Sequence, residues 1–369
     1  MTKSSGALDG IRVVDLSRVL AGPYSTQILG DHGADVIKIE PPGGDETRTW
    51  GPPFQDGVAS YFLGLNRNKR NMVLDLTTEE GRAVLLDLLK DADVLVENFK
   101  SGTLEKWGIG YKDVIAPMFP RLIHCCVSGF GADGPLGGLP GYDAAVQASA
   151  GLMSVNGDPD GEPTRMGVPV VDMFTGMNAA LGILLALQER ARSGLGQSID
   201  VSLYDTAVSV LHPFAPNYLY SGKVPHRVGN AHPNISPYDS YKTKTGPIFL
   251  AVGNDRQFAK MLGILGKPEL AVDERFTSNA GRVVHRVALK VELEELLSDW
   301  DCLELENTLI RSGVPCGAVR TVDQVLAEPH TKHRELLVEI DDYKGIGSPI
   351  KMSRSKASYR LKPPVLPES

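Results

Sequence analysis

The 369-residue sequence predicts an α/β protein, with a larger domain built on a mostly parallel sheet and a smaller α+β domain. In residues 11–212, short β-branched runs alternate with helical patterns, which is typical of a parallel sheet covered on both faces. From Tyr238 onward, two neighbouring strand patterns are followed by helical ones. A chain of this length also exceeds what one hydrophobic core normally supports, so two domains are expected.

In the first half of the chain, apolar periodicity and turn residues predict the helices and strands. Pro23 suits the first turn of a helix, and Gly22 beside it permits a close approach of the backbone. Thr77 to Glu80 reads as a capping box for the helix that follows. The expected strands are Ile11–Leu16, Asp35–Glu40, Met72–Leu76, Val94–Glu97, Leu122–Val127 and Gln197–Ser202. The expected helices are Tyr24–Gly30, Gly81–Lys90, Ala144–Met153, Phe174–Arg192 and Tyr204–His212.

The second half begins after a proline-rich crossover, Pro213–Pro237. A hairpin is expected from Tyr238–Lys242 and Pro247–Val252, joined by Thr243–Gly246. The residues from Leu336 to Ile350 alternate again between apolar and polar. Between them we expect helices over Asp255–Leu265, Arg286–Trp300 and Leu303–Ser312 and a short strand at Gly317–Val319.

Composition excludes several classes of protein. The formal net charge of −7 argues against a general nucleic-acid binder. Residues 1–7 lack the apolar core of a signal peptide, and no segment approaches the ~20 apolar residues of a membrane span, so we expect a cytoplasmic protein that binds no membrane. Four cysteines and the pair His330 and His333 lack metal-ligand spacing, so we expect reduced thiols and no metal site.

The stretch from Val168 to Gly176 contains the strongest candidate for a catalytic residue, Asp172. Asp172 follows an apolar run and precedes a long apolar helix, where a carboxylate is costly to bury unless something uses or pairs it. Two interpretations stay open on local sequence: Asp172 caps the helix, or Asp172 is a catalytic nucleophile. A carboxylate at a helix start could do both, because the helix dipole would help to keep it ionised.

Other reaction classes lack their motifs. There is no G-x-S-x-G elbow, no P-loop and no G-x-G-x-x-G dinucleotide fingerprint. Carboxylate chemistry remains: an ionised aspartate can attack a thioester to form a mixed anhydride. Asn98 and Phe99 follow the strand Val94–Glu97, at the edge where parallel sheets bind ligands.

The chain resembles the class III acyl-CoA transferase family, which includes formyl-CoA and carnitine-CoA transferases. The resemblance rests on segments that occur in the order and spacing of the family, and it continues over Asp255–Arg286 in the second half. Those segments are Leu8–Leu16, Ala21-Gly22-Pro23, Gly33–Glu40, Asn68-Lys69-Arg70, Val96–Phe99, Gly141-Tyr142-Asp143 and Gly167–Asp172.

The resemblance implies roles for individual residues. Asp172 would form an acyl anhydride and then an aspartyl-CoA thioester. Coenzyme A (CoA) would bind across a Rossmann-like large domain as the thioester substrate, with no tightly bound cofactor. Asn98 and Phe99 match the pair that lines the CoA site, and Val19 matches an adenine-side contact. Lys106 matches a basic residue for a CoA phosphate, and Tyr142 matches an active-site tyrosine.

The resemblance also implies an interlocked homodimer and a large domain built from both ends of the chain. We therefore expect residues 1–212 and 328–369 to form the large domain, 213–237 a linker and 238–327 the small domain.

Two departures from formyl-CoA transferase alter the expected site. Pro41 and Pro140 stand where that enzyme has basic CoA contacts, so the phosphates need other cations. The candidates are Lys38, Arg67, Lys69 and Arg70, although a solvated turn also explains the last three. The glycine run that covers the active site in that enzyme is missing, and Val252–Asp255 takes roughly its place.

Two alternatives compete with CoA transfer. α-Methylacyl-CoA racemase shares the fold and the aspartate but needs a second base, for which that family has a histidine at the position of Tyr142. A tyrosine hydroxyl, with an unperturbed pKa near 10, makes a poor base. A CoA-binding protein without catalysis is the other alternative, and the retained Asp172 argues against it.

The acid that receives CoA is less defined. The segments Tyr61–Arg70 and Ser236–Lys244 resemble in sequence those of succinyl-CoA:dicarboxylate transferases such as the glutarate enzyme. A dicarboxylate would need a cation at its far end, and Arg18, Arg165 and His232 are candidates, although each type is commonly a surface residue.

Overall fold

The structure is a computed structural model that describes residues 6–366, and every structural statement below concerns these residues. The chain divides into two compact units. Unit 1 comprises Met1–Leu152, Met166–Pro216 and Pro329–Ser369, and unit 2 comprises Met153–Arg165 and Asn217–Glu328. The first unit therefore uses both ends of the chain. Residues 153–165 and most of the expected linker group with the second unit.

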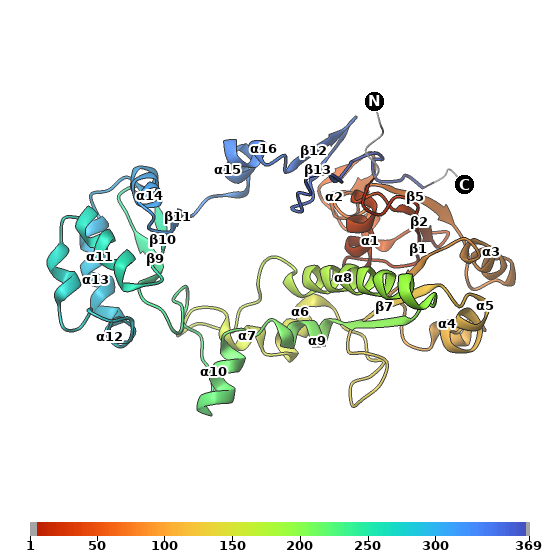
Figure 1. The fold of residues 1–369 in the computed structure, drawn as a ribbon, viewed down its shortest axis with the longest axis horizontal. Coiled ribbons are helices and arrows are strands. Elements are labelled where there is room, and N and C mark those ends of the chain that lie inside the picture. Colours follow the sequence, from red (N-terminus) through yellow and green to blue (C-terminus); the bar gives the residue numbers. More distant parts are fainter. Residues whose placement is uncertain (1–5, 367–369) are drawn as a thin grey trace. The chain divides into compact units, whose positions relative to one another are not determined.

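Unit 1 is built on a six-stranded parallel sheet in the order β5-β2-β1-β6-β7-β8 (Figure 1). The order reverses between β1 and β6, which is the switch point at which open α/β sheets bind ligands. The strands are β1 (Arg12–Asp15), β2 (Asp35–Glu40), β5 (Lys69–Val73), β6 (Val94–Glu97), β7 (Ile123–Ser128) and β8 (Ser198–Ser202).

Both faces of this sheet are covered, so neighbouring residues of a strand enter different cores. Val13 packs in a cluster with Leu29 and Ile183, whereas Val14 packs in another with Leu85 and Leu89. These side chains come from α1 (Ala21–Asp31) and α8 (Val170–Ser193) on one face and from α3 (Glu79–Leu89) on the other. Each such side chain contributes about 1.5–3 kcal/mol of burial free energy.

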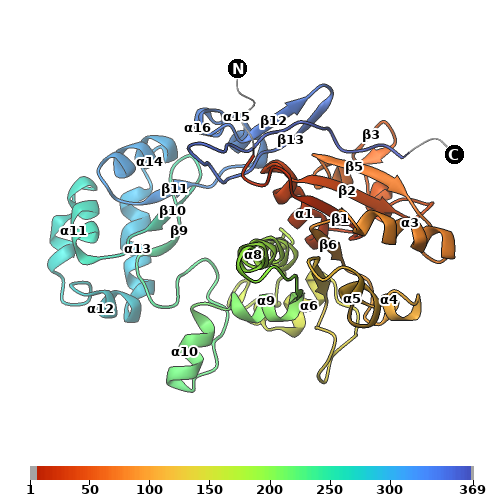
Figure 2. The ribbon, with the colours of Figure 1, turned by 45° about the vertical axis from the view of Figure 1, so that its right-hand side comes forward.

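Helix α8 carries the candidate nucleophile and packs closely against α1. A Cβ at Gly176 would lie 2.6 Å from the carbonyl oxygen of Ala21, so only glycine permits this approach. Figure 2 views α8 almost along its axis, with α9 (Leu203–Ser209) beside it. Among the described residues, α8 alone is long and apolar enough to cross a membrane, a test that core helices of soluble proteins also pass. The expectation that no segment approaches that length was therefore wrong.

Several predicted boundaries shift. Helix α8 begins at Val170, four residues before the expected start, and β5 begins at Lys69 instead of Met72. The cap of α3 is Thr78, whose hydroxyl accepts from the Gly81 N–H, one residue later than the expected box. Helix α6 (Asp143–Ser149) ends before Met153. Helix α10 (Phe214–Ser221) lies in the expected crossover, and α16 (Pro329–His333) contains both His330 and His333.

Unit 2 contains a three-stranded antiparallel sheet in the order β11-β10-β9. The predicted hairpin is formed by β9 (Tyr238–Lys242) and β10 (Pro247–Ala251), and β11 (Cys316–Ala318) pairs with β10. The sheet packs on helices whose buried side chains include Phe258, Leu293 and Leu305. These helices are α11 (Asp255–Ile264), α13 (Arg286–Leu297) and α14 (Cys302–Arg311).

Candidate active site

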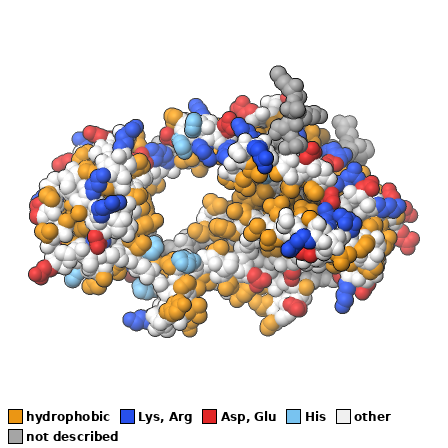
Figure 3. Space-filling view, viewed as in Figure 1, with side chains coloured by type: hydrophobic (Ala, Val, Ile, Leu, Met, Phe, Trp, Pro, Cys, Tyr) orange, Lys and Arg blue, Asp and Glu red, His pale blue; other side chains and the backbone are white. Residues whose placement is uncertain are grey.

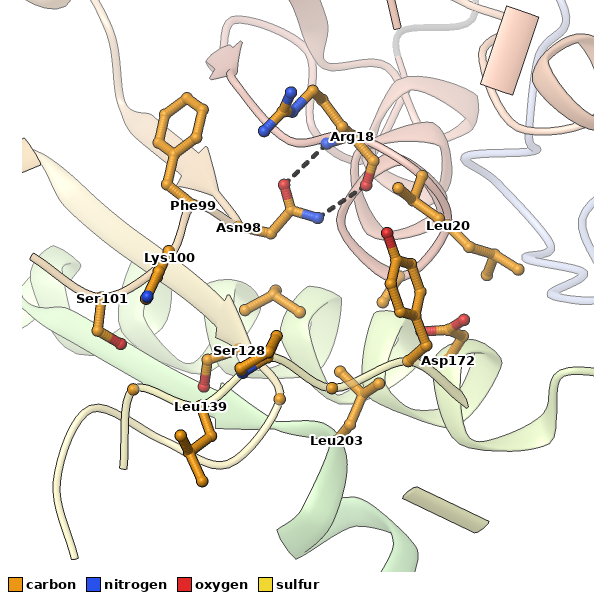
Figure 4. Close-up of a pocket in the computed structure, with 18 of the residues that line it drawn as sticks. Arg18, Leu20, Asn98, Phe99, Lys100, Ser101, Ser128, Leu139, Asp172 and Leu203 are labelled. Carbon is orange, nitrogen blue, oxygen red and sulfur yellow. Dashed lines mark hydrogen bonds between the residues drawn. The ribbon is translucent and has the colours of Figure 1, made fainter. Parts of the chain in front are cut away.

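A cavity of about 220 Å³ lies in unit 1 at the carboxyl ends of β1 and β6. It brings together six residues that the sequence nominated, whereas the five cations nominated as phosphate contacts lie elsewhere. The six that line it are Arg18, Val19, Asn98, Phe99, Tyr142 and Asp172. Glu46 also lines it, as do Lys100 and Ser128 (Figure 4).

Asp172 stands in the first turn of α8, two residues inside the start at Val170. The cap position is residue 169, a proline with no capping side chain. Asp172 therefore lies inside the helix and is not its cap. Its carboxylate lines the cavity, and no described residue donates a hydrogen bond or forms an ion pair with it. An oxygen free of such contacts keeps its lone pairs available for attack on a carbonyl carbon.

The capping function belongs to Asp143, in the first turn of α6. Its Oδ2 accepts from the backbone N–H of Val171 at 2.8 Å and from that of Asp172 at 3.1 Å. Its Oδ1 accepts from Gln147 Nε2 at 2.6 Å, and Gln147 Oε1 accepts from the Met166 N–H at 2.9 Å. Sequence reasoning missed this role because Asp143 precedes the helix that it caps by 27 residues or more.

Burial and the neighbouring Asp143 carboxylate raise the pKa of Asp172 to about 7. The expectation that the helix dipole keeps Asp172 ionised is therefore wrong in direction. The N–H groups of Val171 and Asp172 already donate to Asp143, whose negative charge offsets the positive end of the helix. With this pKa, about half of the molecules carry the ionised carboxylate at neutral pH, and its poor solvation makes the ionised form a stronger nucleophile.

The loop Ser17–Leu20 forms one wall of the cavity and is held in a strained conformation. Val19 has φ +70°, a left-handed conformation that β-branched residues rarely adopt. The Asn98 side chain fixes this loop, because its Oδ1 accepts from the Arg18 N–H at 2.9 Å and its Nδ2 donates to the Arg18 carbonyl at 2.7 Å (Figure 4). Asn98 thus holds in place the loop that forms this wall of the cavity.

Lys38 is fully buried and does not line this cavity, which revises its expected role as a phosphate ligand. Its ammonium donates to the Ser17 carbonyl at 2.7 Å and to Asp45 Oδ2 at 3.0 Å. Asp45 in turn caps the 3₁₀ helix η1 (Glu46–Thr49) by accepting from the Thr47 N–H. Lys38 therefore ties together the two loops that carry Val19 and Glu46.

Lys69 and Arg67 are also buried in ion pairs. Lys69 Nζ lies 3.0 Å from Asp15 Oδ2, and Arg67 Nη2 lies 2.6 Å from Asp31 Oδ2. Burial alone would raise the pKa of Asp15, but the Lys69 and Lys38 ammonium groups lower it to about 2. Gly22 belongs to this arrangement, because a Cβ there would meet the Ser17 side chain at 2.3 Å.

Arg70 and Lys106 are exposed but lie outside the cavity. Arg70 pairs with Asp35 at 2.7 Å, at the amino end of β2, the edge of the sheet opposite to the cavity. Lys106 ends α4 (Thr103–Lys106), and its neighbour Trp107 lines a second cavity. Neither residue lines the cavity beside Asp172, and Lys106 is adjacent in sequence to a residue of the second cavity.

The second cavity, of about 310 Å³, shares Arg18, Phe99 and Lys100 with the first. It lies beyond the carboxyl ends of β1, β2 and β5, and Pro41, Leu74 and Trp107 line it. The guanidinium of Arg18 lies 5.7 Å from the centre of the Phe99 ring. Arg18 and Lys100 are therefore the cations that both cavities share. Nothing in the sequence distinguishes Lys100 beyond its place after Phe99.

The remaining candidates divide between the units. Pro140 lines the first cavity and Pro41 lines the second. Arg165, His232 and the Val252–Asp255 segment belong to unit 2, and in that segment Asn254 caps α11 by accepting from the Gln257 N–H. Among residues 6–366 no group of three His, Cys, Asp or Glu residues has the arrangement of a metal site, and all four cysteines are free.

Comparison with known proteins gives consistent matches over the whole chain. The model of CoA-transferase family III matches residues 8–368. A succinate–glutarate CoA-transferase of Agrobacterium fabrum is 43% identical, covering 98% of this chain and 93% of the relative. An acetyl-CoA:oxalate CoA-transferase of Acetobacter aceti is 40% identical, covering 95% and 90%.

A crystal structure of a CAIB/BAIF family protein from Brucella suis superposes with a TM-score of 0.88. The sequences are 45% identical, and the match covers 98% of this chain and 97% of that one. The α/β fold with its parallel sheet is thus shared with an experimentally determined relative.

Proposed function

Because this chain belongs to CoA-transferase family III, we propose that it transfers CoA from succinyl-CoA to a dicarboxylic acid through covalent intermediates on Asp172. The observation that carries the proposal is the Asp172 carboxylate, which faces the cavity without a hydrogen-bond partner among the described residues. Two of the relatives are named for glutarate and oxalate, which are both dicarboxylates.

The first half of the reaction loads CoA onto the enzyme. A carboxylate oxygen of Asp172 attacks the thioester carbon of succinyl-CoA, the C–S bond breaks, and a succinyl–aspartyl anhydride and the CoA thiolate form. The thiolate then attacks the Asp172 carbonyl carbon. This step releases succinate as a carboxylate and leaves an aspartyl-CoA thioester.

The second half runs the same steps with the acceptor. A carboxylate oxygen of the acceptor attacks the aspartyl thioester and expels the CoA thiolate, which gives a new anhydride. The thiolate attacks the acceptor's carbonyl in that anhydride, releasing the acceptor-CoA thioester and the Asp172 carboxylate. Charges and atoms balance in each half, so no external base is required.

The two cavities of unit 1 give CoA a place to bind. We place the thioester end beside Asp172 and the nucleotide end along the second cavity, where Phe99 and Trp107 offer aromatic faces. Arg18 and Lys100 line both cavities and are the cations available to the phosphates.

The experiment that tests the proposal traps the intermediate. Incubation with succinyl-CoA and no acceptor is expected to give a CoA-thioester adduct on the peptide that carries Asp172, detected by mass spectrometry. Adding glutarate is expected to discharge it. An unmodified peptide combined with measurable transfer would refute the covalent mechanism, and exchange of the α-proton of a 2-methylacyl-CoA without transfer would support the racemase alternative.

Arg18→Gln is expected to raise the KM for succinyl-CoA about 10- to 100-fold with a smaller change in kcat. The substitution removes a charged contact to the phosphates of the bound CoA thioester. Steady-state kinetics with each substrate varied measure this effect. Arg70→Gln is the matched control and should match the wild type, since Arg70 is paired with Asp35 at the opposite edge of the sheet. A larger loss in Arg70→Gln than in Arg18→Gln would contradict the assignment.

We further propose that the protein forms a homodimer whose interface includes α8. The helix presents exposed apolar side chains spaced along one face, and Figure 3 shows hydrophobic side chains gathered in the region of α8. These side chains are Phe174, Met177, Leu181, Leu184 and Leu185. Because this face begins beside Asp172, the interface would adjoin the active site.

The double variant Leu181→Glu/Leu185→Glu is expected to be monomeric, because four buried charges in a symmetric pair of helices would be costly. Light scattering coupled to size exclusion measures the mass. Glu189→Gln, on the same helix, is the control and should stay dimeric. A wild-type protein that elutes as a monomer at all concentrations would contradict the proposal.

A further inference from the structure

A third cavity, of about 420 Å³, lies within unit 2 and has no role in the transfer reaction described above. Its walls come from the Asp158–Pro159 turn, the loop 226–231, strand β9 and helix α13. The volume is in the range of small-molecule sites. We propose that this cavity binds a small oxyanion, carried by a carboxylate or a phosphate.

Two guanidinium groups on the wall are anchored but not neutralised. Arg286 donates from Nε to the Val283 carbonyl and from Nη2 to the Pro233 carbonyl, both at 3.2 Å. Arg227 donates to the carbonyls of Asp158 at 3.0 Å and Gly161 at 2.6 Å. Neither forms an ion pair with a described carboxylate, so both keep their positive charge and spare N–H donors for a ligand.

The other charges on the wall do not cancel these two arginines. Lys290 lies one turn after Arg286 on α13 and is paired with Asp239 at 2.8 Å. Asp158 accepts from the Asp160 N–H through its side chain and forms no ion pair among the described residues. Because the Asp158 carboxylate opposes only one of the two guanidinium charges, the wall of the cavity keeps a net positive charge.

Two buried hydroxyl groups point to a ligand independently of the charges. Tyr241 is 3% exposed and Ser236 is 5% exposed, and both line the cavity. Neither hydroxyl hydrogen-bonds to a described residue, and because both residues line the cavity, their hydroxyl groups are available to a molecule bound there. Burial and the Asp239 carboxylate raise the pKa of Tyr241, so its hydroxyl stays protonated and can donate. Two guanidinium groups and two hydroxyls together form a set of donors that matches an acceptor-only oxyanion.

Titration calorimetry of the full-length protein with inorganic phosphate and, separately, with glutarate tests the proposal. Both titrations are done on the Arg18→Gln variant, which weakens anion binding in unit 1. In that background, Arg286→Gln is expected to weaken binding of the preferred anion about 10- to 100-fold. Arg275→Gln is the matched control in unit 2, because Arg275 is exposed and paired with Asp273.

Tyr241→Phe separates binding from folding. Its hydroxyl has no described partner to lose, so the variant should melt no lower than its parent without ligand, while binding weakens about threefold or more. Binding of phosphate alone or of glutarate alone supports the proposal and identifies the source of the oxyanion. Equal affinities of the parent, Arg286→Gln and Tyr241→Phe, or the absence of any binding in the Arg18→Gln background, would overturn it.

Discussion

Replacing Asp172 with asparagine is expected to lower kcat/KM for CoA transfer by at least about 10⁴-fold, the scale on which removal of a covalent nucleophile acts. The amide has nearly the shape of the carboxylate but cannot form the anhydride. Steady-state transfer from succinyl-CoA measures the loss, and the adduct on the peptide carrying residue 172 should disappear with it. Asp113→Asn, an exposed change in the same unit, should leave the rate unchanged. Retention of a tenth of wild-type activity in Asp172→Asn would rule out the covalent route.

The pH dependence follows from the same carboxylate. Its pKa is raised to about 7, so the ionised nucleophile is lost as pH falls through 7, and kcat/KM should drop tenfold per pH unit below that value. Stability has the opposite sign. The folded state binds this proton more tightly than the unfolded chain. The stabilisation that protonation of Asp172 gives to the folded state is therefore complete below the unfolded pKa of 3.8 and is lost as pH rises through 7.

The asparagine variant has no such charge to desolvate. It should therefore be more stable than the wild type at pH 8, by up to about 4 kcal/mol, which is the free energy that corresponds to the raised pKa of Asp172. At pH 4 the gain in stability should be small. Thermal melts at the two pH values measure this difference. An equal gain at both values would mean that the carboxylate has an ordinary pKa in the folded protein.

Much of the fold was predictable because local sequence determines it. The strands Asp35–Glu40, Val94–Glu97 and Tyr238–Lys242 have the predicted bounds, since alternating or continuous apolar runs are flanked by turn residues. The start of α8 was not predictable from that pattern. Its first turn is stabilised by Asp143, a distant residue whose approach depends on the tertiary fold.

The candidate site shows the same division. Asn98 and Phe99 were found because they follow a predicted strand at the sheet edge that binds ligands. Asp172 was found because it is a lone carboxylate after an apolar run, in a segment that resembles the transferase family. The cations Lys38, Arg67 and Lys69 were misassigned, since a run of basic residues looks the same whether solvent, a phosphate or a buried carboxylate neutralises it. Their partners Asp45, Asp31 and Asp15 are 7, 36 and 54 residues away, so only the folded structure reveals the ion pairs.

Lys38→Met is expected to destabilise the protein by about 3–5 kcal/mol, because it leaves the fully buried Asp45 carboxylate without its cation. The free energy of unfolding in urea measures the loss. Lys90→Met, which removes a surface ion pair with Asp87, is the control and should change stability little.

The double variant Lys38→Met/Asp45→Asn distinguishes a structural charge from a positioning contact. Asparagine keeps the oxygen that accepts from the Thr47 N–H but carries no charge, so most of the lost stability should return. The Ser17 carbonyl still lacks its donor, and the strained Val19 beside it loses one of its restraints. We therefore expect the double variant to fold yet keep a raised KM for succinyl-CoA. Recovery of both stability and KM would show that Lys38 serves only to neutralise Asp45, whereas a persistent rise in KM identifies it as the residue that holds the wall of the CoA cavity in place.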